Sequence, residues 1–172
     1  MRRNILATGA TGKQGSALIH ALLQPTPDPN ATSTPEYHIY ALTRKISSPS
    51  AQHLLSAYGT ENLTLVEGDL DNPSSIAAIF ETAKLDDGRG IWGVFAVMAF
   101  PGLGASTEGE ERQGKLLADM ALEYGVEVYV YSSAMRAGPK WEEKLDLKPS
   151  GKAKRNIEGH CRVLGERGLK WM

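Results

Sequence analysis

The sequence has a single cysteine, Cys161, among its 172 residues. One cysteine forms neither an intramolecular disulfide nor a zinc site built from several thiolates, and it suits a reducing compartment. No stretch approaches the roughly 20 consecutive apolar residues of a membrane span. The apolar run at residues 5–7 is far shorter than the roughly 7–15 residues of a signal-peptide core. We therefore expect a cytoplasmic protein with no membrane partner, or a nuclear one if it is a regulator.

An excess of charge of one sign is also missing, because 19 basic and 20 acidic residues leave a net charge of −1. Such a chain lacks the broad cationic field with which proteins bind nucleic acid, so we expect no nucleic-acid partner. Apolar residues make up 41% of the chain and charged residues 23%, as in one globular domain over residues 1–172. The histidines share no metal-ligand spacing, which predicts no metal site: His20, His38, His53 and His160.

Strand-like and helix-like segments alternate along the chain. Short apolar runs predict strands at residues 5–7, 37–42, 63–66, 91–99 and 126–131. Segments with apolar residues at helical spacing separate these runs, and a last helix is expected over residues 152–167. This alternation predicts an α/β fold, a doubly wound parallel sheet with helices on both faces. We expect the strand order 3-2-1-4-5, with a partial sixth strand at residues 169–172.

Short sequence signals mark the ends of two helices. Asn72 followed by Pro73 is typical of an N-cap with proline at the first helical position. Thr107 and Glu110 match a capping box, in which each side chain binds the backbone N–H of the other. Gly125 predicts the end of the helix that this box begins.

Three glycines stand between the first strand and the first helix, as Gly9-x-x-Gly12-x-x-Gly15. Glycine there allows a tight turn, lets the backbone approach a pyrophosphate, and lets helix and strand pack closely. The helix N-terminus then points free N–H groups at the phosphates. The competing loop, G-x-x-x-x-G-K-[ST], is excluded because Gln14 stands where serine or threonine is needed. We expect a nucleotide at the carboxyl ends of the strands, bound by Gly9, Ala10, Thr11, Gly12, Lys13, Gln14 and Gly15.

The spacing of these glycines and six further motifs resemble the NmrA-like branch of the atypical short-chain dehydrogenases/reductases. The motifs occur in family order at residues 7–15, 42–44, 67–70, 113–119, 131–133, 154 and 157–158. The resemblance implies a Rossmann domain that binds NAD(P). Relatives of this branch continue into a C-terminal lobe that forms most of the substrate pocket, and this chain stops before it. The substrate is therefore not predicted.

The end of the second strand lacks the acidic residue with which NAD-binding proteins hold the ribose 2′-hydroxyl. The chain has Arg44 there, which can pair with a 2′-phosphate, so we expect NADP as the cofactor. The resemblance places further residues along the cofactor: Asp69 and Leu70 at the adenine, and Met98, Ala99 and Phe100 at the ribose and nicotinamide.

The resemblance also implies two catalytic residues, Lys154 and Ser133, with Lys154 holding the nicotinamide ribose as well. Typical relatives pair the lysine with a tyrosine four residues earlier, where this chain has Ser150. A serine hydroxyl is a much poorer acid than a phenol, so the usual carbonyl-reductase mechanism does not carry over. Lys152 is the alternative to Lys154, and Ser133 reads equally well as a serine that caps a strand end.

Two functions follow from these features. The first is an NADP-dependent oxidoreductase that acts on a small molecule in a metabolic or secondary-metabolite pathway. The second is a non-catalytic NADP(H) sensor that regulates a protein such as a transcription factor. An open sheet edge beside the sixth strand would favour a homodimer or another protein partner in either case.

Overall fold

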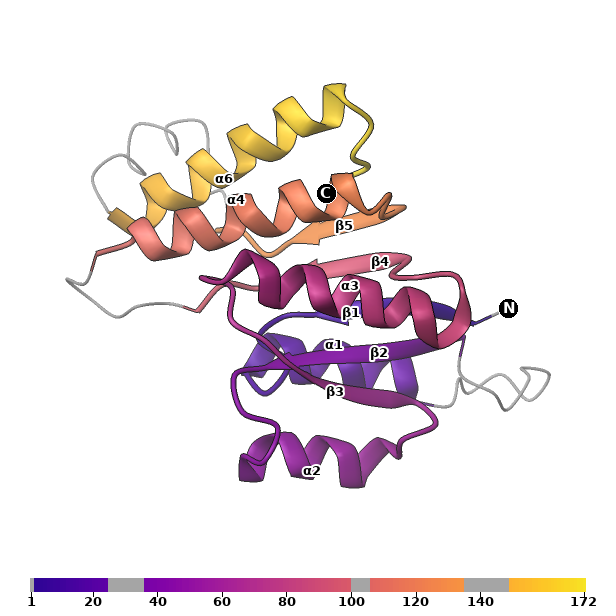
Figure 1. The fold of residues 1–172 in the computed structure, drawn as a ribbon. Coiled ribbons are helices and arrows are strands. Elements are labelled where there is room, and N and C mark those ends of the chain that lie inside the picture. The colour runs from indigo at the N-terminus through magenta and orange to yellow at the C-terminus, as the bar shows by residue number, and fades with distance from the viewer. Residues whose placement is uncertain (1, 25–35, 100–105, 135–148) are drawn as a thin grey trace.

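The computed structural model describes residues 2–24, 36–99, 106–134 and 149–172 (Figure 1). Its parallel sheet has five strands in the order β3-β2-β1-β4-β5, which confirms the predicted topology. The strands are β1 (Arg3–Ala7), β2 (Tyr37–Thr43), β3 (Leu63–Glu67), β4 (Gly93–Ala96) and β5 (Val128–Tyr131). The helices are α1 (Lys13–Leu23), α2 (Pro49–Tyr58), α3 (Pro73–Asp87), α4 (Glu108–Glu123) and α6 (Pro149–Glu166). None of the described helices is long and apolar enough to span a bilayer.

The sheet is buried between two helical layers because successive side chains of a strand point to opposite faces. In β1, Leu6 packs in the core formed with α3, α4 and α6, whereas Ile5 and Ala7 pack in the core formed with α1 and α2. Strand β1 lies at the centre, with Ile5 in register with Ile39 of β2 and with Gly93 of β4. The carboxyl ends of the strands therefore meet at one edge of the sheet.

Both predicted helix starts are confirmed, but the capping box predicted at the second is wrong. The Asn72 side chain accepts hydrogen bonds from the backbone of the first turn of α3, with Pro73 as the next residue. Thr107 occupies the N-cap position of α4 but makes no capping bond through its side chain. Glu110 is instead buried against Lys154 of α6, so it does not complete the box. The tertiary contact with α6 therefore holds the Glu110 side chain that the capping box requires.

The C-terminal residues add a short parallel segment beside β5. Trp171 forms a single parallel bridge with Tyr129, and the Tyr131 N–H donates to the Met172 carbonyl at 2.9 Å. This is the predicted partial sixth strand, and it pairs part of the edge that the sequence led us to expect open. The last helix also starts earlier than predicted, at Pro149.

Candidate functional site

The glycine loop is shaped by contacts that leave no room for side chains. Gly9 has a φ of +57°, which favours glycine, and its carbonyl accepts a hydrogen bond of 2.8 Å from the Gly12 N–H. A Cβ on Gly15 would lie 2.3 Å from the Gly9 oxygen, so helix α1 can approach the loop this closely only with glycine there. The buried Thr8 ties the loop to the end of β4, because its hydroxyl accepts from the Val97 N–H at 2.7 Å. The N-terminus of α1 is thereby fixed at the sheet edge.

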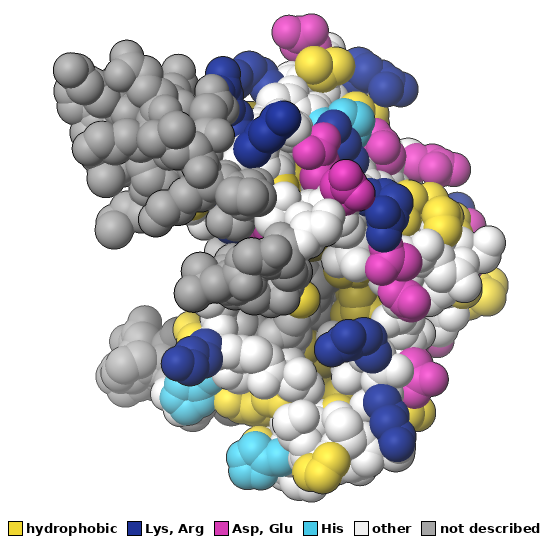
Figure 2. Space-filling model, turned by 90° about the vertical axis from the view of Figure 1, so that its left-hand side faces the viewer, with side chains coloured by type: hydrophobic (Ala, Val, Ile, Leu, Met, Phe, Trp, Pro, Cys, Tyr) yellow, Lys and Arg dark blue, Asp and Glu magenta, His cyan; other side chains and the backbone are white. Residues whose placement is uncertain are grey.

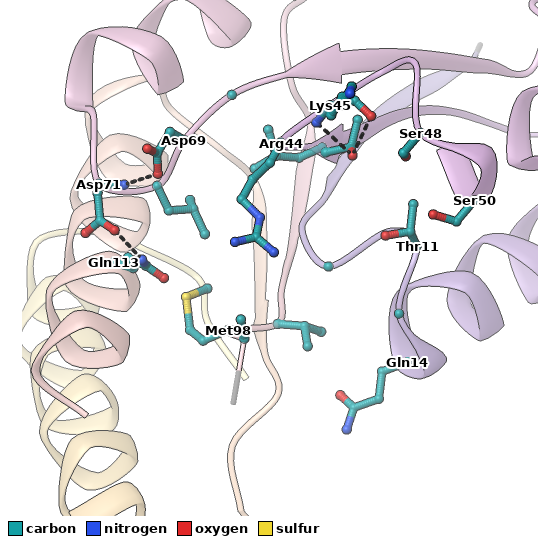
Figure 3. A pocket seen from close by; sticks show the side chains of 18 of the residues that line it. Thr11, Gln14, Arg44, Lys45, Ser48, Ser50, Asp69, Asp71, Met98 and Gln113 are labelled. Atoms are coloured by element: carbon teal, nitrogen blue, oxygen red, sulfur yellow. Dashed lines mark hydrogen bonds between the residues drawn. The ribbon is translucent and has the colours of Figure 1, made fainter. Parts of the chain in front are cut away.

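A groove of about 780 Å³ runs along this edge (Figure 3). Seen from there, the surface is hollowed, with hydrophobic side chains in the depression and charged ones around it (Figure 2). Ten of the predicted cofactor residues line the groove: Gly9, Thr11, Gly12, Lys13, Gln14, Arg44, Asp69, Leu70, Met98 and Ala99. The ends of β1 to β4 contribute to it, which is where the glycine loop predicted a nucleotide.

The other predicted residues lie elsewhere. Ala10 and Gly15 are buried in the loop and support it rather than line the groove. Ser133 follows β5 and Lys154 lies on α6, and neither lines the groove. Phe100 lies outside the described residues.

One end of the groove carries positive charge. Figure 3 shows the Arg44 side chain extending into the groove after β2, with Lys45 next to it and Thr11, Ser48 and Ser50 across from it. Within the described chain neither Arg44 nor Lys45 forms an ion pair, so both cations are available to an anion. The nearby Glu67 carboxylate is turned to the backbone, accepting from the Ile46 N–H at 3.0 Å. This end suits a phosphate group and offers no carboxylate to a ribose hydroxyl.

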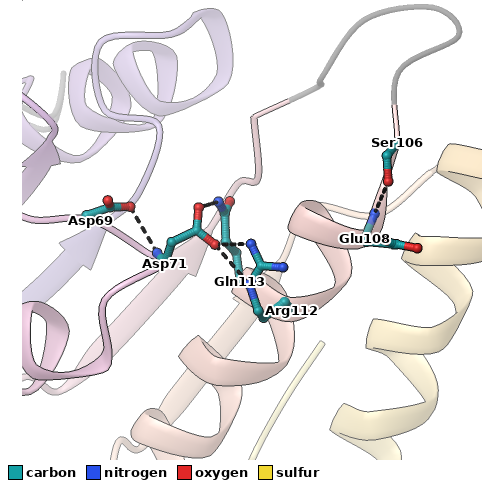
Figure 4. Close-up of polar contacts among 6 residues, drawn as sticks. All are labelled: Asp69, Asp71, Ser106, Glu108, Arg112 and Gln113. Atoms are coloured by element: carbon teal, nitrogen blue, oxygen red, sulfur yellow. Dashed lines mark hydrogen bonds and ion pairs between the residues drawn. The ribbon is translucent and has the colours of Figure 1, made fainter.

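A polar cluster closes the groove on the side of α3 and α4 (Figure 4). The Asp71 carboxylate accepts hydrogen bonds from Arg112, at 3.0 Å from Nε, and from Gln113, at 2.7 Å from Nε2. These bonds lower the pKa of Asp71, the one from Arg112 most. The Asp71 N–H in turn donates to Asp69 at 2.9 Å. The cluster therefore links the turn after β3 to helix α4 and orients Asp69, the residue expected beside the adenine.

Sequence reasoning missed six polar residues of the groove: Thr43, Lys45, Ser48, Ser50, Asp71 and Gln113. The first five lie at the end of β2, in the first turn of α2 or in the segments that follow β2 and β3, so extending the prediction along the carboxyl ends of these strands would have found them. Gln113 lies inside α4, and no local signal marks it as a groove residue.

The end of β5 is joined to the glycine loop. The Ser132 hydroxyl donates to the Gln14 side-chain carbonyl, and the Ser132 N–H donates to the Ala96 carbonyl at 2.9 Å. Ser133, the predicted catalytic serine, is half-buried and donates its N–H to the Tyr131 carbonyl at 3.0 Å. Both serines thus lie beside the strand ends that form the groove.

Lys154 is held by charge and by an aromatic ring. Its Nζ lies 2.9 Å from Oε1 of Glu110 on α4 and 5.7 Å from the centre of the Tyr131 ring. Burial, followed by the charge of Glu110, raises the pKa of Tyr131 far above the usual tyrosine range. A buried phenol with its pKa raised in this way is a poor proton donor. The Ser150 side chain lies outside the described part of the chain.

By sequence, the chain is similar to proteins named as NmrA-like family domain-containing oxidoreductases. It is 30% identical over 170 residues to the NmrA-like family domain-containing oxidoreductase lnaB of Aspergillus flavus, covering 95% of this chain and 43% of the relative. It is 31% identical over 169 residues to the corresponding oxidoreductase FrzB of Cladobotryum sp., covering 94% and 42%. The chain thus spans less than half the length of these relatives.

Solved structures share the fold. The Escherichia coli NADPH-dependent quinone oxidoreductase QOR2, complexed with NADPH, aligns with a TM-score of 0.63 and 19% identity over 97% of this chain and 46% of that one. The Citrobacter sp. triphenylmethane reductase, complexed with NADP(H), aligns with a TM-score of 0.65 and 18% identity over 94% and 46%. The family model for the NmrA-like family matches residues 1–168. The chain therefore belongs to the NmrA-like family.

Proposed function

We propose that the chain is the cofactor-binding part of an NADP-dependent oxidoreductase. The observation that carries the proposal is the groove, in which a glycine loop at the start of α1 lies opposite Arg44 and Lys45, two cations that form no ion pair with any residue that the structure describes. Backbone N–H groups at a helix N-terminus and arginine side chains both bind phosphate. The groove has the N–H groups at the glycine loop and the cations after β2. The sequence relatives are named as oxidoreductases, and the similar solved structures are reductases complexed with NADPH or NADP(H), which supports the same function.

The groove residues divide the cofactor among them. The glycine loop would bind the pyrophosphate, because it presents backbone and no side chain. Arg44 and Lys45 would bind the 2′-phosphate, and Asp69, oriented by Asp71, would border the adenine together with Leu70. This arrangement assigns the glycine loop, the cations after β2 and the turn after β3 to one dinucleotide.

The remaining residues would act on the nicotinamide side. Met98 and Ala99 line the groove after β4, Ser133 follows β5, and Lys154 lies in the second turn of α6 over the ring of Tyr131. A bound NADPH supplies a hydride for reduction. Lys154 would hold the ribose and provide the positive charge beside the substrate, while Ser133 would orient the substrate. The substrate would be a small molecule of a metabolic or secondary-metabolite pathway.

A non-catalytic NADP(H) sensor is the second candidate. The observation that favours it is Ser150 in the position of the tyrosine, with the nearby Tyr131 phenol buried and hard to ionise. A sensor would use the same groove to bind the cofactor and would pass the state of the cofactor to a protein partner.

One experiment separates the two candidates. The purified chain is titrated with NADPH and NADH by calorimetry, then mixed with NADPH and a panel of quinones, enones and carbonyl compounds while cofactor absorbance is followed. Tighter binding of NADPH than NADH supports the NADP site, and substrate-dependent loss of absorbance supports the oxidoreductase. NADPH binding without turnover, both here and in a form extended to the length of the relatives, favours the sensor. Equal affinity for the two cofactors contradicts the NADP assignment.

A further inference from the structure

Glu110 is a carboxylate buried in the first turn of α4. Its side chain is 1% exposed, and in the described residues neither carboxylate oxygen accepts a hydrogen bond. The contact that the structure gives it is the ion pair with Lys154, at 2.9 Å but without hydrogen-bond alignment. Burying a carboxylate is costly unless a charge compensates it, so this glutamate depends on the lysine. The positive end of the α4 dipole adds to the compensation.

The packing of α4 on α6 does not need this ion pair. The two helices pack closely at Gly114, where a Cβ would lie 2.5 Å from the Ile157 side chain. Further along the two helices, Oδ1 of Asp119 on α4 lies 2.7 Å from Nε2 of His160 on α6. Buried ion pairs contribute little net stability compared with apolar pairs of similar size. A purely structural role therefore leaves the presence of a buried Glu110 unexplained.

The position of the pair relates it to the groove. Glu110 follows β4 and Lys154 precedes the close contact at Ile157 by one helical turn, so both lie at the carboxyl edge of the sheet. The ring beneath the lysine belongs to Tyr131, the last residue of β5, and the next residue, Ser132, is bonded to Gln14 of the glycine loop. The lysine ammonium is thus held next to the strand ends that form the groove.

We propose that Glu110 is a positioning residue for Lys154, whose ammonium it holds at the carboxyl end of β5 for contact with the cofactor. This inference rests on the proposed function, in which Lys154 binds the nicotinamide ribose. Lysine has a long flexible side chain, and a fixed partner removes the rotamers in which the ammonium would point to solvent. Glu110 itself touches neither the cofactor nor the substrate in this arrangement.

A double-mutant cycle in NADPH affinity tests the proposal. Calorimetric titration is carried out on the wild-type chain, Glu110→Gln, Lys154→Met and the double variant. Loss of a hydrogen bond from a charged group predicts about tenfold weaker binding for Lys154→Met. We expect about fivefold weaker binding for Glu110→Gln, and no further loss when Glu110→Gln is added to Lys154→Met. This non-additivity shows that the two side chains act on affinity through one interaction, and the Asp119→Asn control separates that from a general effect of the helix pair.

Asp119→Asn is the matched control, because it also removes a carboxylate of α4 that pairs with a side chain of α6. It should leave NADPH affinity within about twofold of wild type. Circular dichroism and thermal unfolding check that each variant is folded. If Lys154→Met alone unfolds because it leaves Glu110 unpaired, Glu110→Gln is compared with the double variant, which has no buried charge. The proposal then predicts that these two affinities differ by no more than about twofold.

The possible failures are distinguishable. Wild-type affinity in Glu110→Gln, with weakened binding in Lys154→Met, overturns the positioning role and leaves the proposed function intact. Losses that multiply in the double variant also overturn it, because Glu110 would then act independently of Lys154. Unchanged affinity in Lys154→Met overturns the inference together with the role of Lys154 in the proposed function. Weakened binding in Asp119→Asn equal to that of Glu110→Gln shows a general effect of the helix pair and overturns it as well.

Discussion

Replacing Arg44 by alanine should separate the two nicotinamide cofactors. Arg44 extends into the groove and forms no ion pair within the described chain, so its guanidinium is free to bind the phosphate that NADPH has and NADH lacks. A hydrogen bond to a charged group contributes about 1.5–3 kcal/mol. Because Arg44 is exposed, solvent screening places the effect at the lower end of that range. At about 1.4 kcal/mol per factor of ten, NADPH should bind about tenfold more weakly to Arg44→Ala.

The assay is calorimetric titration of wild type and Arg44→Ala with each cofactor at two salt concentrations. NADH affinity should change by less than about twofold, and the loss for NADPH should shrink at high salt because counterions screen the phosphate. Arg162→Ala, which removes an exposed cation of α6, controls for the change in net charge. Equal losses for NADPH and NADH, or a loss as large in Arg162→Ala, would refute the assignment of Arg44 to the 2′-phosphate.

Three further predictions concern the loop, the polar cluster and the buried thiol. Gly12→Val should abolish NADPH binding in calorimetry while circular dichroism stays native, because a branched side chain would stand at the phosphate-binding backbone; unchanged affinity would make the loop a simple turn. Asp71→Asn should lower the urea midpoint at neutral pH. The pKa of Asp71 is lowered in the folded state, mainly by Arg112, so this contribution is present above the ordinary carboxylate range and lost as pH falls through the lowered pKa. A difference between the urea midpoints of wild type and Asp71→Asn that persists in strong acid would contradict this. The Cys161 thiol is fully buried and burial raises its pKa to about 11, so it should react with a thiol reagent only after unfolding; rapid labelling of the native protein would show otherwise.

Most of the fold could be predicted because its signals are local. Residues 63–66 and 126–131 are apolar runs of strand length, and β3 and β5 lie within one or two residues of them. The helix start at Asn72 needs only its own side chain and the next turn, and it formed as predicted. The helix after Thr107 also begins as predicted, but its capping box did not form, because Glu110 contacts Lys154 of α6 instead. Local signals thus hold where no distant residue competes for the same group.

The candidate site divides in the same way. The glycine loop, Arg44 and Asp69 stand directly after strands, and strand ends in a parallel sheet always meet at one edge, so their convergence follows from the order of elements alone. Met98 and Ala99 line the groove for the same reason. Ser133 follows β5 and so reaches the same edge, but sequence order could not show that it and Lys154 lie beside the groove rather than in its lining.

Turn chemistry and hydrophobic periodicity were therefore enough to predict a doubly wound parallel sheet and the edge that carries the groove, whereas the strand order followed from the glycine spacing and the family resemblance. Only the tertiary structure decided how helix α4 is rotated and which residues of α6 and of the turn after β3 it meets. That rotation pairs Glu110 with Lys154 and brings Gln113 to Asp71 across 42 positions of sequence. The physical reason is that a helix presents different side chains to its neighbours with every change in its packing angle, and that angle depends on close contacts such as Gly114 on Ile157, which no local pattern encodes.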